Sequence, residues 1–167
     1  MQPLKTPEDI ALPPFAIGTP GIEVLRAAAA GVAPAPPAAA LLGWHALSIE
    51  PGRVRVRFTA REEFYNPMGS VQGGFLAAML DDAMGPALFT LLEVGPPAPT
   101  IEMKVNFLRP ATAGTLIGEG RVVHLTRSLA FLEGALCAED GALIATATAT
   151  ACLGSGPNGG GGRGYPG

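Results

Sequence analysis

The chain has 167 residues, of which 48% are hydrophobic and 15% charged, and its formal net charge is -3. This composition is typical of one compact domain with a sizeable core, and it excludes a disordered chain and a disulfide-rich secreted scaffold. No cluster of lysines or arginines indicates a nucleic-acid partner. No apolar stretch reaches membrane length and no leader-like segment is present, so we expect a cytoplasmic protein with a small-molecule partner and no membrane contact.

The N-terminal half begins with a proline-rich segment over residues 1–18, which we expect to be loosely held. A Thr-Pro pair and a later glycine delimit a short predicted helix over residues 21–30. A proline-broken connector then leads to a strand that begins near Trp44. The stretch RVRVRFTA, residues 53–60, alternates basic and apolar residues, which predicts a strand with one solvated face.

A polar loop over residues 61–72 precedes the longest predicted helix, residues 73–92. Alternating and β-branched stretches separated by glycine or proline turns predict three or four further strands, over residues 100–110, 114–125, 128–138 and 142–153. The glycine-rich tail, residues 154–167, can bury nothing and is expected to be disordered. We therefore expect a single α+β domain over residues 19–153, with a curved antiparallel sheet wrapped around one long helix.

The two cysteines lie in the last two predicted strands, which an Asp-Gly turn joins as a hairpin. That register places Cys137 opposite about Ile144, and Cys152 opposite about Leu129. We expect two free thiols. The cysteines and the two histidines show no metal-ligand spacing, so neither a metal nor another cofactor is predicted.

The long predicted helix has two different faces on a helical wheel. Its apolar side carries Phe75, Leu76, Met79, Leu80, Ala83 and Ala87. The other side carries small residues and one acid, namely Gly74, Ala77, Ala78, Asp81 and Gly85. A face of small residues predicts that another group approaches the helix closely there.

The paired aspartates and paired glycines of this helix also have ordinary structural explanations. Asp81 and Asp82 would lie on a partly solvated helix side, or pair with a basic group such as Arg109 or Lys104. A double glycine before a helix is commonly a permissive turn. These explanations rest on the residues alone, and they stay open at this point.

Several stretches occur together: NPMGSVQGGFLAAMLDDAMGPAL, the strand end NFLRPATAG, and DGALIATATATACL. In this combination the chain resembles the hotdog-fold acyl-CoA thioesterases of the PaaI (phenylacetate pathway) type, over roughly residues 19–153. The resemblance implies a long helix wrapped by an antiparallel sheet, a working dimer that often pairs into a tetramer, and an acyl-CoA substrate.

The resemblance also implies roles for individual residues. Asp81 occupies the position of the catalytic carboxylate, as a general base or as a nucleophile. Gly73 matches the residue whose backbone N–H polarises the thioester carbonyl, and Asn66 a polar loop residue that helps hold substrate or water. Gln72 stands where most relatives have histidine; it can shape the substrate loop beside Gly74, but it cannot carry a proton between pH 5 and 8.

Further residues are candidates for substrate binding. Arg127 and Ser128 lie in a predicted turn between two strands, and Arg109 lies at a strand end, where each could meet the phosphates of coenzyme A. Met68 is a candidate for the acyl pocket, together with apolar residues of the long helix and Phe89 or Leu92 of a neighbouring subunit; aromatic and medium-chain acyl groups both stay open.

Helix geometry adds a constraint of its own. Gly73 and Asp81 are separated by about 12 Å along a helix, which is too far for both to act on one thioester carbon. We therefore expect Gly73 of one subunit to face Asp81 of another across a two-fold interface. A non-catalytic acyl-CoA-binding domain is the alternative, and Gln72 favours it.

Overall fold

The structure is a computed structural model, and it describes residues 17–32, 35–95 and 98–154. Its elements in chain order are α1 (Gly21–Ala29), α2 (Pro37–Leu42), β1 (His45–Glu50), β2 (Arg53–Ala60), a short 3-10 helix (Glu62–Phe64), α3 (Gly73–Phe89), β3 (Thr100–Phe107), β4 (Gly114–Leu125), β5 (Leu129–Ala138) and β6 (Leu143–Cys152). Nearly all of the predicted loose start and glycine-rich tail lies outside these described residues. In the described part, no helix has the length and apolarity needed to cross a membrane.

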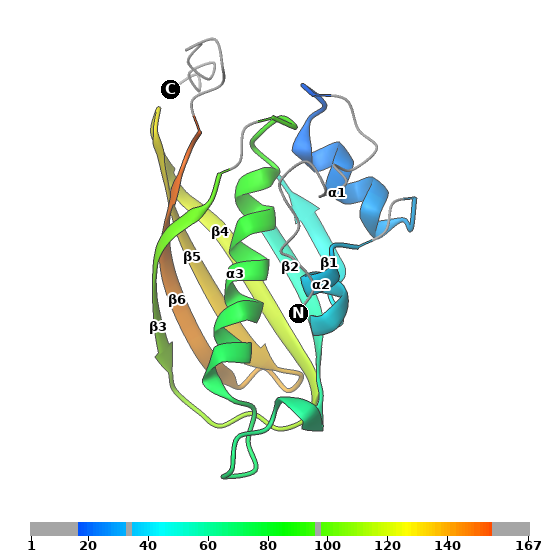
Figure 1. Ribbon diagram of the computed structural model, residues 1–167, viewed down its shortest axis with the longest axis vertical. Coiled ribbons are helices and arrows are strands. Elements are labelled where there is room, and N and C mark those ends of the chain that lie inside the picture. The colour runs from blue at the N-terminus through cyan, green and yellow to red at the C-terminus, as the bar shows by residue number, and fades with distance from the viewer. Residues whose placement is uncertain (1–16, 33–34, 96–97, 155–167) are drawn as a thin grey trace, which may run out of the picture.

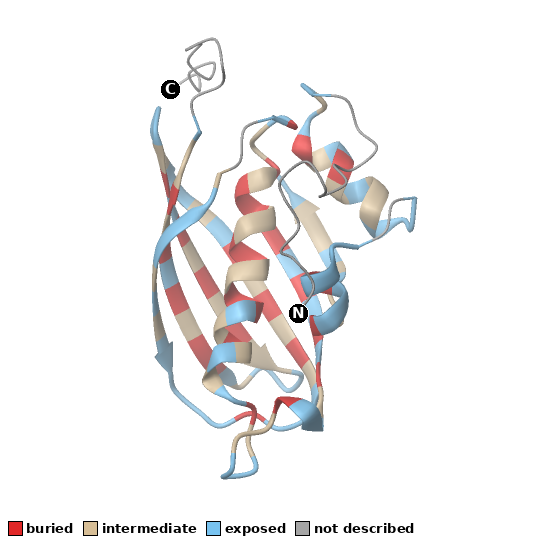
Figure 2. Ribbon diagram, in the orientation of Figure 1, coloured by how far each residue is buried: buried red, intermediate tan, exposed pale blue. Residues whose placement is uncertain are grey.

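The strands form one antiparallel six-stranded sheet in the order β1-β2-β4-β5-β6-β3. Helix α3 packs along one face of this curved sheet, and α1 and α2 lie near the β1 edge (Figure 1). The buried residues gather where α3 and the strands face each other (Figure 2). The predicted α+β arrangement of one long helix on an antiparallel sheet is confirmed.

The core follows from the two periodicities in the sequence. In β2 the apolar residues Val54, Val56 and Phe58 are buried, while the arginines between them point to the other face. From α3, the side chains of Met79 and Leu80 are completely buried against the sheet. Each such side chain contributes about 1.5–3 kcal/mol of hydrophobic stabilisation.

The end of the long helix differs from the prediction. Helix α3 ends at Phe89 rather than at residue 92, because the Thr90 hydroxyl accepts the Gly52 N–H at 2.7 Å and donates to the Ala87 carbonyl at 2.7 Å. These bonds fix the helix end to the turn between β1 and β2.

The predicted connector contains the short helix α2. Its prolines were interpreted as breaks, but Pro37 occupies a first helical position, where its missing N–H costs nothing. Gly43 ends the helix with a φ of 67°, a left-handed conformation that glycine adopts without strain.

The hairpin of β5 and β6 keeps the cysteines apart as expected. Cys152 lies opposite Leu129, and Cys137 lies opposite Leu143, one residue from the expected partner because the register shifts at Cys137. Both thiols are free.

Helix α3 approaches the sheet very closely at Gly120 of β4. A Cβ atom at Gly120 would lie 2.7 Å from Met84 Cα, and closer still to the backbone oxygen of Ala83. Both atoms belong to the helix backbone, so they cannot move aside without moving the helix. Glycine at this position therefore sets the distance between helix and sheet.

We predict that Gly120→Ala lowers the free energy of unfolding by about 1–3 kcal/mol, because the extra methyl overpacks this contact. Urea unfolding followed by the fluorescence of Trp44, the single tryptophan, measures the change. The matched control is Gly85→Ala on the opposite face of α3, where a Cβ would have nothing within 4 Å. That substitution should raise the free energy of unfolding by about 0.5–1 kcal/mol. A destabilisation of equal size in both variants would contradict the close contact.

Candidate functional site

Asp81 lies half-buried on the small-residue face of α3, beside the start of β3. The Thr100 hydroxyl donates a 2.9 Å hydrogen bond to its Oδ1, which orients the carboxylate. Within the described residues, neither Arg109 nor Lys104 forms an ion pair with Asp81. The explanation of Asp81 as the partner of one of these basic groups is therefore wrong. The sequence-based list of site residues missed Thr100, because only the fold brings this first residue of β3 beside the helix.

Asp82 has a different environment from its neighbour. Its Oδ2 is inaccessible to water and has no hydrogen-bond partner among the described residues. Burial raises the pKa of this carboxyl to about 7, and the nearby Asp81 carboxylate acts in the same direction. Asp82 is therefore only partly solvated, as expected, with one carboxylate oxygen shielded from water.

The backbone at Asp82 is also unusual. Pro86 has no N–H with which to bond the carbonyl four residues earlier, which is that of Asp82. The Trp44 indole N–H fills this position, donating to the Asp82 carbonyl oxygen at 3.2 Å. The backbone carbonyl of Asp82 thus joins α3 to the segment before β1.

We predict that Asp82→Asn raises the free energy of unfolding at pH 8 by up to about 4 kcal/mol. A carboxyl whose pKa is raised on folding binds its proton more tightly in the folded state than in the unfolded state. The wild type therefore loses free energy of unfolding as the pH rises from about 4 to 7. The stability difference between variant and wild type should therefore shrink as the pH falls from 7 towards 4. Urea unfolding at pH 4.5, 6 and 8 tests this, and a difference independent of pH would contradict it.

The N-terminus of α3 presents a backbone donor. Gln72 is the N-cap, and its side-chain oxygen accepts the Gly74 N–H at 2.8 Å. The Gly73 N–H has no acceptor within the parts of the chain that the structure describes. A Cβ at Gly73 would lie 3.1 Å from the Phe107 ring, so only glycine leaves this ring undisturbed. Capping by Gln72 thus satisfies one of the two glycine donors and leaves the other available.

The loop before α3 is organised by Asn66. Its Oδ1 accepts the Met68 N–H at 2.9 Å, and its Nδ2 donates to the Ser70 hydroxyl at 3.1 Å. Met68 is 86% exposed. The roles of Asn66 and Met68 towards a substrate stay predictions, and the structure shows that the asparagine amide holds the loop.

The predicted site residues fall into two groups within one chain. Around the N-terminus of α3 lie Asn66, Met68, Gln72, Gly73, Gly74 and, after β3, Arg109. At the end of the sheet where β3 begins lie Asp81 and the exposed turn residues Arg127 and Ser128. Within one chain, α3 separates the two groups, because Gly73 and Asp81 lie about 12 Å apart along this helix.

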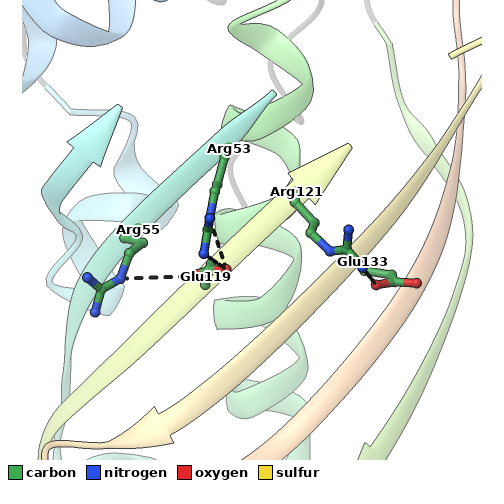
Figure 3. Close-up of polar contacts among 5 residues, drawn as sticks. All are labelled: Arg53, Arg55, Glu119, Arg121 and Glu133. Carbon is green, nitrogen blue, oxygen red and sulfur yellow. Dashed lines mark hydrogen bonds and ion pairs between the residues drawn. The ribbon is translucent and has the colours of Figure 1, made fainter. Parts of the chain in front are cut away.

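A separate depression of about 250 Å³ lies on the face of the sheet turned away from α3. Figure 3 shows its charged side chains Glu119, Arg121 and Glu133 with the neighbouring Arg53 and Arg55, which pair across the strands. Arg53 and Arg55 contact Glu119 at 2.7 and 3.6 Å, and Arg121 contacts Glu133. Because each of these charged groups already takes part in an ion pair, this depression is not the candidate site. No group of three or more potential metal ligands occurs in the described residues.

A long helix on a curved antiparallel sheet defines the hotdog fold, and comparisons with known proteins agree. A model of the thioesterase superfamily matches residues 68–145. Human acyl-coenzyme A thioesterase 13 is 30% identical over 111 residues, which cover 65% of this chain and 79% of that protein.

Solved structures give the same result. A phenylacetic acid degradation-related protein from Ralstonia eutropha has a TM-score of 0.72 and 38% identity, covering 77% of this chain and 98% of that one. A Streptococcus mutans protein solved with acetyl-CoA bound has a TM-score of 0.61 and 26% identity, covering 66% and 89%. The chain belongs to the thioesterase superfamily. The resemblance to PaaI-type proteins and the expected enzyme class, a thioester hydrolase, are thereby confirmed.

Proposed function

We propose that the protein hydrolyses an acyl-CoA thioester to a free acid and coenzyme A, with Asp81 as general base or nucleophile. Water supplies the oxygen that joins the acyl carbon, the C–S bond breaks, and the departing sulfur takes a proton. The observation that carries this proposal is the Asp81 carboxylate, which Thr100 orients on an uncovered face of α3. A general base needs such a carboxylate within hydrogen-bond reach of the attacking water.

The N-terminus of α3 supplies the second requirement, a donor for the oxygen on which negative charge develops. The Gly73 N–H lies at the positive end of the helix dipole and is unpaired within the described chain. Such preorganised donors stabilise the transition state of acyl transfer more than the ground state.

The two groups act together only if a second subunit contributes. Both residues lie on one helix, whose rise per residue holds them about 12 Å apart. The sheet offers a place for a second copy, since β3 is an edge strand that pairs with β6 alone among the described strands. An unpaired edge can bond a second copy of itself. We therefore propose a dimer in which the partner subunit's Gly73 approaches Asp81; pairing into tetramers is compatible with this arrangement.

Coenzyme A also needs positive charge for its phosphates. Arg109 and Arg127 are exposed, and within the described residues no carboxylate lies within 4.0 Å of either. They remain our candidates for phosphate contacts, with Ser128 beside Arg127. The acetyl-CoA bound to the related Streptococcus mutans protein supports the class of ligand.

Thiol release from a panel of acyl-CoAs, followed with a chromogenic thiol reagent, tests the proposal. Turnover of at least one acyl-CoA is expected from the wild type. Calorimetric binding of acyl-CoA without turnover would instead support the non-catalytic binding domain that Gln72 favours. If the protein neither binds nor hydrolyses any acyl-CoA, both functions are contradicted.

A further inference from the structure

The last residue of β3, Phe107, lies against the first residue of α3. A Cβ atom at Gly73 would lie 3.1, 3.3 and 3.4 Å from the Cζ, Cε2 and Cε1 atoms of the Phe107 ring. These three atoms form the free end of the ring, so the ring turns its edge towards Gly73. Both residues lie at the end of the molecule where β3 stops and α3 starts (Figure 1). The ring therefore stands beside the Gly73 N–H, which has no acceptor in the described chain.

Backbone hydrogen bonds tie β3 and the start of α3 to the rest of the fold. Phe107 pairs with Ala145 of β6, which is completely buried. On the helix side, the Val71 N–H donates to the Ala111 carbonyl oxygen at 2.8 Å, which joins the loop before α3 to the segment after β3. These bonds fix where the Phe107 backbone lies relative to the N-terminus of the helix.

The packing of the core does not explain the ring. Phe107 is 53% exposed and lies outside the hydrophobic core, whereas Phe58 and Phe64 are buried within it. An exposed aromatic ring on an edge strand leaves apolar surface in water, which a polar residue would avoid. The place of the ring beside an unpaired donor offers a reason for a phenylalanine at this position.

We propose that Phe107 is a positioning residue that keeps water from one side of the Gly73 N–H. This inference rests on the proposed function. An N–H that is open to water bonds water, which the thioester oxygen must then displace. An apolar ring removes part of this competition, and a preorganised donor stabilises developing charge more strongly where water is excluded. The ring edge also carries the positive part of the aromatic quadrupole, which favours an oxyanion nearby.

Phe107→Ala should lower kcat for acyl-CoA hydrolysis about tenfold, a part of the roughly 10²–10³-fold that a whole oxyanion donor contributes. KM should change by less than about threefold, because the ring acts on the transition state rather than on binding. Phe107→Leu keeps an apolar side chain and should recover most of the loss. The matched control is Phe131→Ala, which removes an exposed phenylalanine from the face of the sheet turned away from α3 and should leave kcat unchanged.

A comparison of double variants shows whether Phe107 acts through the Gly73 N–H. Phe107→Ala is combined with Gly73→Ala, which keeps the N–H, and with Gly73→Pro, which lacks it. Both substitutions place a Cβ beside the ring, so the effect of this atom is common to the two backgrounds. Phe107→Ala should lower kcat at least about fivefold more in the Gly73→Ala background, because only coupled residues depart from additivity. Equal effects in the two backgrounds would overturn the inference.

The remaining outcomes separate this inference from the function on which it rests. No thiol release by the wild type from any acyl-CoA of the panel would overturn both. Turnover by the wild type with an unchanged kcat in Phe107→Ala would overturn the role of Phe107 alone. A lower molecular mass of Phe107→Ala by light scattering would also overturn this role, since the exposed ring would then be a contact between subunits.

Discussion

Asp81→Asn is expected to reduce kcat for acyl-CoA hydrolysis by about 10²–10⁴-fold, the usual contribution of a general base. The amide has nearly the same size as the carboxylate, and its oxygen can still accept the Thr100 hydroxyl hydrogen bond. It can neither take a proton from water nor attack the thioester carbon. Steady-state thiol release at saturating acyl-CoA measures the loss, and calorimetry should show that acyl-CoA still binds.

Asp82→Asn is the matched control, because it makes the same chemical change one residue further along α3. Its Oδ2 is shielded from water, only its backbone carbonyl bonds Trp44, and its carboxyl has no place in the proposed chemistry. Turnover should therefore stay within a few-fold of the wild type. If both variants lose turnover equally, or if Asp81→Asn keeps it, Asp81 is not the catalytic carboxylate.

Gly73→Pro is expected to reduce kcat by about 10²–10³-fold, the usual cost of losing one donor to the developing oxyanion. Proline removes the backbone N–H, yet it suits the first position of a helix. Gln72 before it already has a ψ of 135°, which is the conformation that proline favours in its predecessor. The helix should therefore form normally, as circular dichroism can verify.

Gly73→Ala separates the lost donor from the added bulk. It keeps the N–H and adds a Cβ near the Phe107 ring, which is half-exposed and can move. We expect Gly73→Ala to be clearly more active than Gly73→Pro. Equal activity in the two variants would mean that the N–H has no part in catalysis.

Local patterns in the sequence predicted most of the fold. The alternation of RVRVRFTA fixed both the position and the buried face of β2, because a half-buried strand repeats every two residues. Helix α2 was missed because prolines that start a helix and prolines that break one look alike in a short stretch. The end of α3 was misplaced because Thr90 bonds a turn that lies far away in sequence.

The candidate site could be predicted only where its geometry is local to one helix. The spacing of Gly73 and Asp81 follows from the helical repeat, so the sequence alone indicated that one chain is not enough. The Thr100 contact to Asp81 and the burial of Asp82 depend on how β3 and the Trp44 segment fold against α3. Two adjacent aspartates look equivalent in a sequence, and tertiary packing makes them different.

The most direct test of a site shared between subunits uses mixed dimers. Asp81→Asn and Gly73→Pro chains with different tags are co-expressed, and dimers that carry one of each are isolated by two affinity steps. If the partner subunit's Gly73 serves Asp81, each mixed dimer has one intact site and should recover about half of the wild-type kcat per dimer. Mixed dimers as inactive as either parent would contradict the shared site.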